Sequence, residues 1–401
     1  MKILHTSDWH LGHRLYEQSQ HDEQLAFLTW LKQCIIEQNI DILLVSGDLY
    51  DTGVPSTQSQ KLYYDFLIGI QSTSCKHIVI TGGNHDAPGT INAPKALLEA
   101  LSIKVVGRAT EQPEDEVFTL QVNDEKVIIA AVPYLRDQDI RRAVAGESFD
   151  QIENRYKQAL TNHYHTVGEY CKTIRQNHVP IIAMGHLFAI GGSVSDSELD
   201  IYVGNLGHIG AEDFHPIFDY IALGHLHKPQ RVGKKDHIRY SGSPNILSFS
   251  EVGYEKQVLV LETKANAITS IRPIEIPIFR ALIKLNGSLK ECILKLEEID
   301  VLTSLTPWVE ITLDETMITR PQLDEFHEKA KTTGVEILKI ALKEERQTKG
   351  LEQLLSESKK VKELSPVEVF KLKCKEQDFN LDEHQPILDA FNEALQIVRK
   401  G

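Results

Sequence analysis

Five short apolar runs are spread over the first 223 residues, and each ends at a turn residue or a polar residue. Short aliphatic runs of this kind predict strands that are covered on both faces. Side chains that follow such strands gather beyond the carboxyl ends of the sheet, so the polar residues after the five runs are predicted to line one crevice. The runs span residues 3–4, 42–45, 78–80, 181–184 and 220–223.

Helical stretches are predicted between these runs, near residues 21–38, 57–71, 92–101 and 148–177. The turn pair Asn123-Asp124 lies between two further apolar runs and predicts a hairpin inserted into the α/β order. We therefore expect residues 1–275 to form one α/β domain.

The pattern changes after residue 275. Strands are predicted at 281–285, 309–313 and 335–342 and helices at 289–296 and 322–332, so residues 276–343 are expected to form a small α+β domain. Residues 344–401 are predicted to be a charged helical tail, with a capping box from Ser365 to Glu368. Two short helices cannot bury apolar stripes in isolation, so the tail must dock on this chain or on a partner. One stripe consists of Leu388, Phe391, Leu395 and Val398.

Cysteine usage and hydropathy restrict the compartment. The chain has 401 residues and five cysteines, which are scattered singly and fit a reducing compartment without a disulfide framework. No N-terminal signal segment and no run of about 20 apolar residues occurs, so we expect a cytoplasmic protein that does not enter a membrane.

The net charge of -14 opposes unaided binding to nucleic acid, because proteins that grip duplex DNA use many Lys and Arg side chains. Charge can still be patterned locally, and two basic clusters occur. We expect the chain alone to bind DNA weakly and to need a second copy or a partner. The clusters are Arg136, Arg141 and Arg142, and Lys228, Arg231, Lys234 and Lys235.

The five motifs after the apolar runs carry the chemistry. They are Asp8-Trp9-His10, Gly47-Asp48, Gly83-Asn84-His85-Asp86, Gly185-His186 and Gly224-His225-Leu226-His227. They combine carboxylate, amide oxygen and imidazole without thiolate, a mixture that suits Mn²⁺, Fe²⁺ or Zn²⁺ in a two-metal phosphoesterase site. Asp48 lies near the middle of the series and is the natural bridging carboxylate. The predicted ligands are Asp8, His10, Asp48, Asn84, His186, His225 and His227.

His85 follows the predicted ligand Asn84 directly, so its ring should reach the same substrate. We assign His85 as the acid that protonates the leaving oxygen. An imidazole in this role needs an orienting partner, and either Asp51 or Asp86 could serve. For Asp51, a helix cap or a solvated loop position is an equally good interpretation.

Taken together, these motifs resemble the signature of the calcineurin-like metallophosphoesterases. Segments 1–12, 47–53, 240–244 and 363–370 are similar to the nuclease subunits of that family that work with a coiled-coil ATPase. The resemblance implies a β-sandwich flanked by helices, with two Mn²⁺ ions per chain. It further implies that one ion is held by Asp8, His10, Asp48 and His227 and the other by Asp48, Asn84, His186 and His225.

The same resemblance implies the roles of the other parts of the chain. The small domain would cap the active site, and the tail would dock at the base of the ATPase coiled coil. Helices within 57–71 and 92–101 would form a homodimer inside a heterotetramer. Such an assembly would be nucleoid-associated and would act on double-stranded and single-stranded DNA.

We therefore expect a Mn²⁺-dependent DNA nuclease subunit, an exonuclease on duplex ends and an endonuclease on single strands and hairpins, in recombination, replication and end processing. One alternative is a phosphomonoesterase or cyclic-nucleotide phosphodiesterase with the same site. The capping domain and tail argue against it, because a small substrate needs neither. A second alternative is a non-catalytic adaptor for an ATPase, against which the full ligand set and His85 argue.

Overall fold

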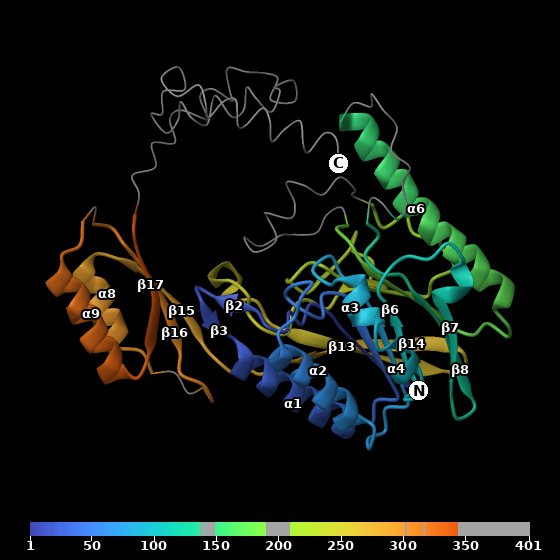
Figure 1. The fold of residues 1–401 in the computed structure, drawn as a ribbon, viewed down its shortest axis with the longest axis horizontal. Coiled ribbons are helices and arrows are strands. Elements are labelled where there is room, and N and C mark those ends of the chain that lie inside the picture. The colour runs from blue at the N-terminus through green and yellow to red at the C-terminus, as the bar shows by residue number, and fades with distance from the viewer. Residues whose placement is uncertain (137–138, 140–148, 190–208, 301–302, 316, 344–401) are drawn as a thin grey trace. The chain divides into compact units, whose positions relative to one another are not determined.

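The computed structural model describes residues 1–136, 139, 149–189, 209–300, 303–315 and 317–343 (Figure 1). Residues 1–313 and 319–341 form one compact unit, which holds the predicted site. Residues 314–318 and 342–401 form the other. The predicted tail helices and the cations Arg141 and Arg142 lie outside the described residues.

Two six-stranded sheets build the centre of the first unit. The first sheet has the order β14-β13-β1-β4-β5-β6, and β1, β4, β5 and β6 run parallel. β13 and β14 add an antiparallel edge. Its strands are β1 (Lys2–Thr6), β4 (Ile42–Ser46), β5 (His77–Thr81), β6 (Ile103–Val106), β13 (Gln257–Lys264) and β14 (Ala267–Glu275).

The second sheet has the order β11-β12-β10-β9-β8-β7. β8, β9, β10 and β12 are parallel, and β7 and β11 are antiparallel edge strands. Its strands are β7 (Val117–Val122), β8 (Glu125–Ala131), β9 (Ile181–His186), β10 (Tyr220–Gly224), β11 (Gln230–Arg231) and β12 (Ile238–Tyr240).

The two sheets pack face to face, with helices on their outer faces. On β4, Ile42 and Leu44 point into the core between the sheets, whereas Leu43 and Val45 point towards α1 (His21–Gln38) and α2 (Thr57–Ile70). On the far side, α6 (Phe149–Ile174) covers the second sheet. Both faces of each sheet are therefore apolar, which is why the strands read as continuous hydrophobic runs rather than alternating ones. The predicted mixed α/β class is confirmed.

Most predicted elements occur near their expected bounds, with two differences. The helix predicted at 92–101 is two short helices, α3 (Pro88–Asn92) and α4 (Lys95–Glu99), because Pro94 between them has no N–H to continue a helix. The sequence interpretation also missed the β13–β14 hairpin, which covers β1. The hairpin at Asn123 is present, joining β7 to β8.

The small α+β region follows the predicted order of elements. It comprises β15 (Leu282–Gly287), α8 (Leu289–Glu297), β16 (Trp308–Leu313), α9 (Arg320–Thr333) and β17 (Glu336–Leu342). Arg280, at its start, stacks 4.1 Å from the Trp308 ring centroid and lies 2.5 Å from a carboxylate oxygen of Glu23 on α1. The short hairpin β2 (Arg14–Leu15) and β3 (Gln18–Ser19) also reaches it, where Tyr16 donates to Glu310 at 2.6 Å. None of the helices in the described part of the chain has the length and apolarity to cross a bilayer.

Candidate metal centre

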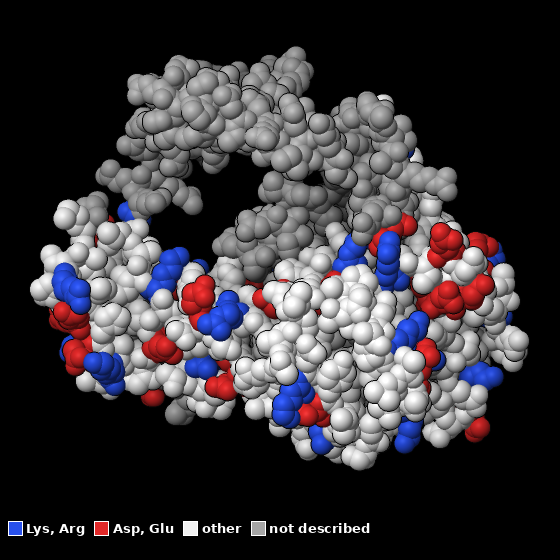
Figure 2. Space-filling view, viewed as in Figure 1, with Lys and Arg blue, Asp and Glu red and all other residues white. Residues whose placement is uncertain are grey.

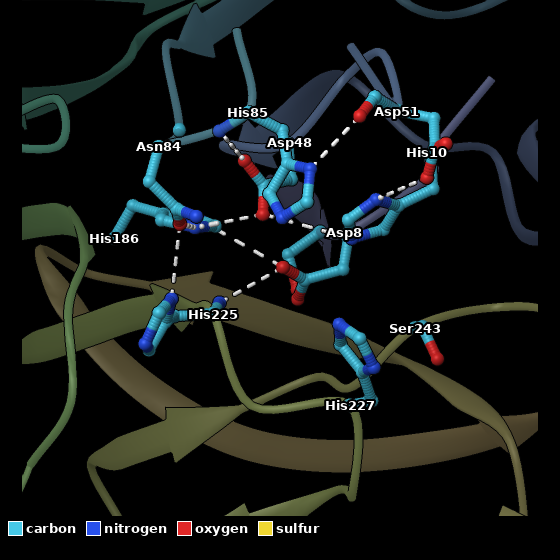
Figure 3. Close-up of polar contacts among 12 residues, drawn as sticks. Asp8, His10, Asp48, Asp51, Asn84, His85, His186, His225, His227 and Ser243 are labelled. Carbon is cyan, nitrogen blue, oxygen red and sulfur yellow. Dashed lines mark hydrogen bonds and ion pairs between the residues drawn. The ribbon is translucent and has the colours of Figure 1, made fainter. Parts of the chain in front are cut away.

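The predicted ligands lie on loops that follow five strands and meet at one edge of the two sheets (Figure 3). β1, β4 and β5 are parallel neighbours in the first sheet, and β9 and β10 are parallel neighbours in the second. In Figure 3, His186 and His225 lie on one side of Asp8, and His10 and His227 lie on the other. The structure thus brings all seven predicted ligands into one cluster.

The backbone of this cluster is strained. Asp8, His10, Asp48 and His225 have positive φ angles of 53°, 45°, 46° and 102°, which L side chains rarely adopt. Hydrogen bonds hold the loops in place, including one of 3.0 Å from the His10 amide to the Asp48 carbonyl. A Cβ atom on Gly83 would lie 2.1 Å from Asp48 Oδ1, so that position must be glycine. Strain concentrated on ligand residues is typical of a functional site.

Asp8, His10 and His227 form the first group, with ligand atoms within 4.8 Å of one another. Neither ring nitrogen of buried His10 has a hydrogen-bond partner within the described ranges; its nearest carboxylate oxygens are Asp51 Oδ1 at 3.3 Å and Asp48 Oδ2 at 3.6 Å. Burial lowers the pKa of His10, which favours the neutral form that binds metal. An unsatisfied buried imidazole beside carboxylates fits a divalent cation.

Asp8, Asp48 and His186 form a second group within the same 4.8 Å limit. Asn84 Oδ1 lies 2.9 Å from His186 Nε2 and 3.1 Å from His225 Nδ1, which joins both residues to this group. Asp48 Oδ2 lies 3.1 Å from His186 Nε2 and 3.6 Å from His10 Nε2. Asp48 therefore stands between the two groups, where a bridging ligand would have to be.

The two histidines of the second group differ in charge preference. Burial alone would lower the pKa of His186, but the Asp48 and Asp8 carboxylates raise it to about 9. For His225, burial and the neighbouring His186 lower the pKa to about 3. Burial would raise the pKa of Asp48, yet His186 holds it well below its usual range. Loading a cation at this group must therefore displace a proton from His186, since metal binds the neutral ring.

His85 lies half-buried beside the cluster and is oriented by main-chain atoms. Its Nδ1 lies 2.8 Å from the Asp51 carbonyl oxygen, and its amide donates to Asp48 Oδ1 at 2.9 Å. The Asp51 carboxylate instead contacts His13 Nδ1 at 2.8 Å and His10 Nδ1 at 3.3 Å. The Asp86 carboxylate accepts hydrogen bonds from the amides of residues 49, 50 and 83 at 2.9 to 3.0 Å. Asp86 thus clamps two ligand loops together and does not contact the His85 ring.

Three residues near the cluster were not singled out from the sequence. His13 is held between Asp51 and the Leu247 carbonyl, which lies 3.0 Å from His13 Nε2. Glu251 contacts the ring of His227, and Lys256 contacts Glu251. His13 follows the first motif closely enough to have been considered. Glu251 and Lys256 carry no local signal, because only the fold places them behind the site.

Comparisons with known proteins agree with this geometry. The Calcineurin-like phosphoesterase family matches residues 1–229, and the Type 5 capsule protein repressor C-terminal domain family (SbcD_C) matches residues 278–378. The SbcD subunit of the nuclease SbcCD from Escherichia coli (strain K12) is 33% identical over 406 residues, which cover 99% of this chain and 98% of that protein. The Bacillus subtilis (strain 168) protein of the same name is 32% identical, covering 66% of each chain.

The fold, the ligand cluster and the family match define this chain as a calcineurin-like phosphoesterase with a His/Asp metal-binding cluster. Within that class, similarity over almost the full length of both chains places it in the SbcD family, and the chain belongs to these nuclease subunits. It is thus a hydrolase of the metallophosphoesterase type.

Proposed function

We propose that this chain is a Mn²⁺-dependent DNA nuclease subunit that acts with an SbcC-type coiled-coil ATPase. The observation that carries the proposal is the single cluster of seven carboxylate, amide and imidazole ligands with His85 at its edge. This donor set suits manganese and other divalent ions that prefer nitrogen and oxygen ligands.

One cation would be held by Asp8, His10, Asp48 and His227, and the other by Asp48, Asn84, His186 and His225. The short contacts of Asp48 to histidines of both groups support a bridging role for its carboxylate. A pair of divalent ions supplies Lewis-acid stabilisation of a phosphodiester and favours in-line attack by water.

The remaining chemistry is assigned to residues of the chain itself. His85 donates from Nδ1 to the Asp51 carbonyl, which fixes the ring so that Nε2 can protonate the leaving oxygen. Asp51 thereby has two roles: its carbonyl orients His85, and its carboxylate supports His10. The Asp86 clamp and Arg136, which donates to the Asp86 carbonyl at 2.6 Å, keep the His85 loop in place.

The domain organisation is part of the proposal. Residues 1–275 would be the nuclease domain, 276–343 the capping domain and 344–401 the tail that binds the ATPase. The second family match, which spans 278–378 in one piece, supports a functional link between the cap and the tail. The relatives' name, which makes them part of a nuclease called SbcCD, supports an SbcC partner and hence a cytoplasmic, nucleoid-associated assembly on DNA.

A homodimer within a heterotetramer would form through α2 and α4. Five of the apolar residues that suggested this interface, from Leu62 to Leu98, are buried in the chain's own core. Others remain exposed: Leu97 is 70% exposed and Ile68 is 66% exposed. Figure 2 shows a broad area without charged side chains over α3 and the adjoining parts of α2 and α4. A second copy would cover this surface.

DNA contacts beyond the metals are expected to be weak for the chain alone. An open groove of about 640 Å³ beside the His227 loop is lined by Lys228, Arg231 and Arg239. Arg231 and Arg239 both pair with Asp236, at 3.0 and 3.2 Å, which offsets part of their charge. This balance supports the need for a partner to present duplex DNA.

The test uses labelled linear duplex, single-stranded and hairpin DNA with Mn²⁺ and then Mg²⁺, with and without the ATPase partner. We expect Mn²⁺-dependent cleavage of single strands by the chain alone and ATP-dependent degradation of duplex ends with the partner. Hydrolysis of cyclic nucleotides or phosphomonoesters without DNA cleavage would favour the small-substrate enzyme. No hydrolysis of any phosphoester would favour the adaptor.

A further inference from the structure

Behind the first ligand group lies a buried charged network that the ligand assignment does not use. Glu251 is fully buried, Ser243 is fully buried and Lys256 is 7% exposed. Glu251 sits on the short 3₁₀ helix η2 (Phe249–Glu251), and Lys256 follows in the next loop. Buried charges of this kind are rare unless they are paired and serve a purpose.

Glu251 is directed at the ring of His227. Its Oε1 lies 2.9 Å from His227 Nδ1. Since a carboxylate can only accept, Nδ1 carries the proton and Nε2 keeps its lone pair. Figure 3 shows that one ring nitrogen of His227 faces Asp8, in the direction of the cluster.

Lys256 fixes the carboxylate from the other side. Its Nζ lies 2.7 Å from Glu251 Oε2 and 2.7 Å from Ser243 Oγ, and 3.3 Å from the His227 carbonyl oxygen. The Leu247 amide also donates to Glu251 Oε2 at 3.2 Å. Burial would raise the pKa of the Glu251 carboxyl, but Lys256 and His227 hold it far below its usual range. Glu251 is thus an anchored, ionised acceptor.

The second ligand group has no equivalent support in the described structure. His186 Nδ1 lies 3.0 Å from the main-chain carbonyl of Ser46, which is a neutral acceptor. A carboxylate polarises an imidazole more strongly than a carbonyl does, and it makes the opposite nitrogen a better ligand. The Glu251 contact therefore acts on one group only.

We propose that Glu251, held by Lys256, is a positioning residue that fixes the tautomer and orientation of His227 and strengthens the first metal site selectively. The inference rests on the proposed function, in which His227 is a ligand. Outer partners of metal-bound histidines contribute roughly 10–100-fold to metal affinity, so loss of the charge on Glu251 should weaken one of the two sites by that factor.

The experiment is a Mn²⁺ titration of the full chain by calorimetry and by the spin resonance signal of free Mn²⁺. Glu251→Gln keeps an acceptor oxygen but removes the charge, and should weaken one site by about 10–100-fold while the other keeps its affinity. Glu169→Gln is the matched control, because Glu169 also contacts a histidine, His215, at 2.9 Å, but is exposed and carries no predicted ligand. The control should bind both ions as the parent chain does.

Glu251→Asp is the second variant, since it preserves the negative partner of Lys256 if Glu251→Gln does not fold. It should fold and should show a smaller, still one-sided, loss of affinity. Two sites of unchanged affinity in whichever folded variant is measured would overturn the role of Glu251 and leave the proposed function standing. A parent chain that binds fewer than two Mn²⁺ ions would overturn both.

Discussion

His85 Nδ1 and the main-chain carbonyl oxygen of Asp51 lie 2.8 Å apart. A carbonyl can only accept, so the contact places a proton on Nδ1 and leaves Nε2 for the substrate. The orientation of His85 therefore depends on the backbone of the Asp51 loop and not on a carboxylate. This arrangement leaves the Asp51 side chain free to support His10.

Asp48 and His10 should differ in their effect on metal content. Asp48→Ala removes the carboxylate that contacts histidines of both groups, so both ions should be lost or greatly weakened. His10→Ala removes a ligand of one group, so one ion should remain. Titration with Mn²⁺ separates the two variants, and equal partial losses in both would contradict a bridging Asp48.

Deletion of residues 344–401 should separate catalysis from partner binding. Every proposed site residue lies at or before His227, so the shortened chain should keep both ions and Mn²⁺-dependent cleavage of single-stranded DNA. It should lose co-purification with the ATPase and ATP-stimulated degradation of duplex ends. An intact complex, or a collapse of the melting temperature, would show that the tail is structural.

Charged substitutions on the exposed apolar surface should dissociate the dimer. Ile68→Glu with Leu97→Glu places two like charges on each copy where the interface is proposed, and both side chains are largely exposed in the single chain. Sedimentation velocity should show a shift to monomer without a change in melting temperature. Leu294→Glu, at an exposed apolar position on α8, is the control and should leave the dimer intact.

His5 should make the fold sensitive to acid. Burial lowers the pKa of His5 to about 3, against the usual 6.5, so the folded chain holds the neutral ring whereas the unfolded chain binds a proton below about pH 6.5. Stability is thus present above that pH and falls as the pH drops, by about 1.4 kcal/mol per pH unit from this residue.

Replacing His5 by Gln keeps a polar partner for the Tyr220 hydroxyl, 3.1 Å from His5 Nδ1, and removes the titration. Urea unfolding at pH 7 and pH 5.5 measures the effect. The pH-dependent loss of stability should be smaller in His5→Gln than in the parent chain. His178→Gln, at an exposed position, should behave as the parent does; an equal loss in all three proteins would rule out His5 as the source.

The ligand set could be proposed from the sequence because metal chemistry restricts both residue type and place. Asp8, Asp48 and His225 each follow a buried strand, and parallel strands bring their carboxyl ends to one edge. The helices α1 and α6 were predictable for the same kind of reason, since long periodic segments give a strong signal.

The supporting residues could not be proposed in this way. Glu251 and Lys256 lie in a loop after the last motif, and only the tertiary fold brings them behind His227. The split at Pro94 is different, because the proline was visible and its effect on the helix was underestimated. The role of the Asp51 carbonyl leaves no trace in the sequence at all, since every residue has that group.

The most direct test of the two-metal nuclease is His85→Asn, with bound Mn²⁺ and cleavage of single-stranded DNA measured on the same preparation. The parent chain should hold two ions and cleave. The variant keeps all seven proposed ligands, so it should also hold two ions, yet cleave roughly 10²–10⁴-fold more slowly because the acid is missing. Loss of one ion, or cleavage at the parent rate with both ions bound, would contradict this account.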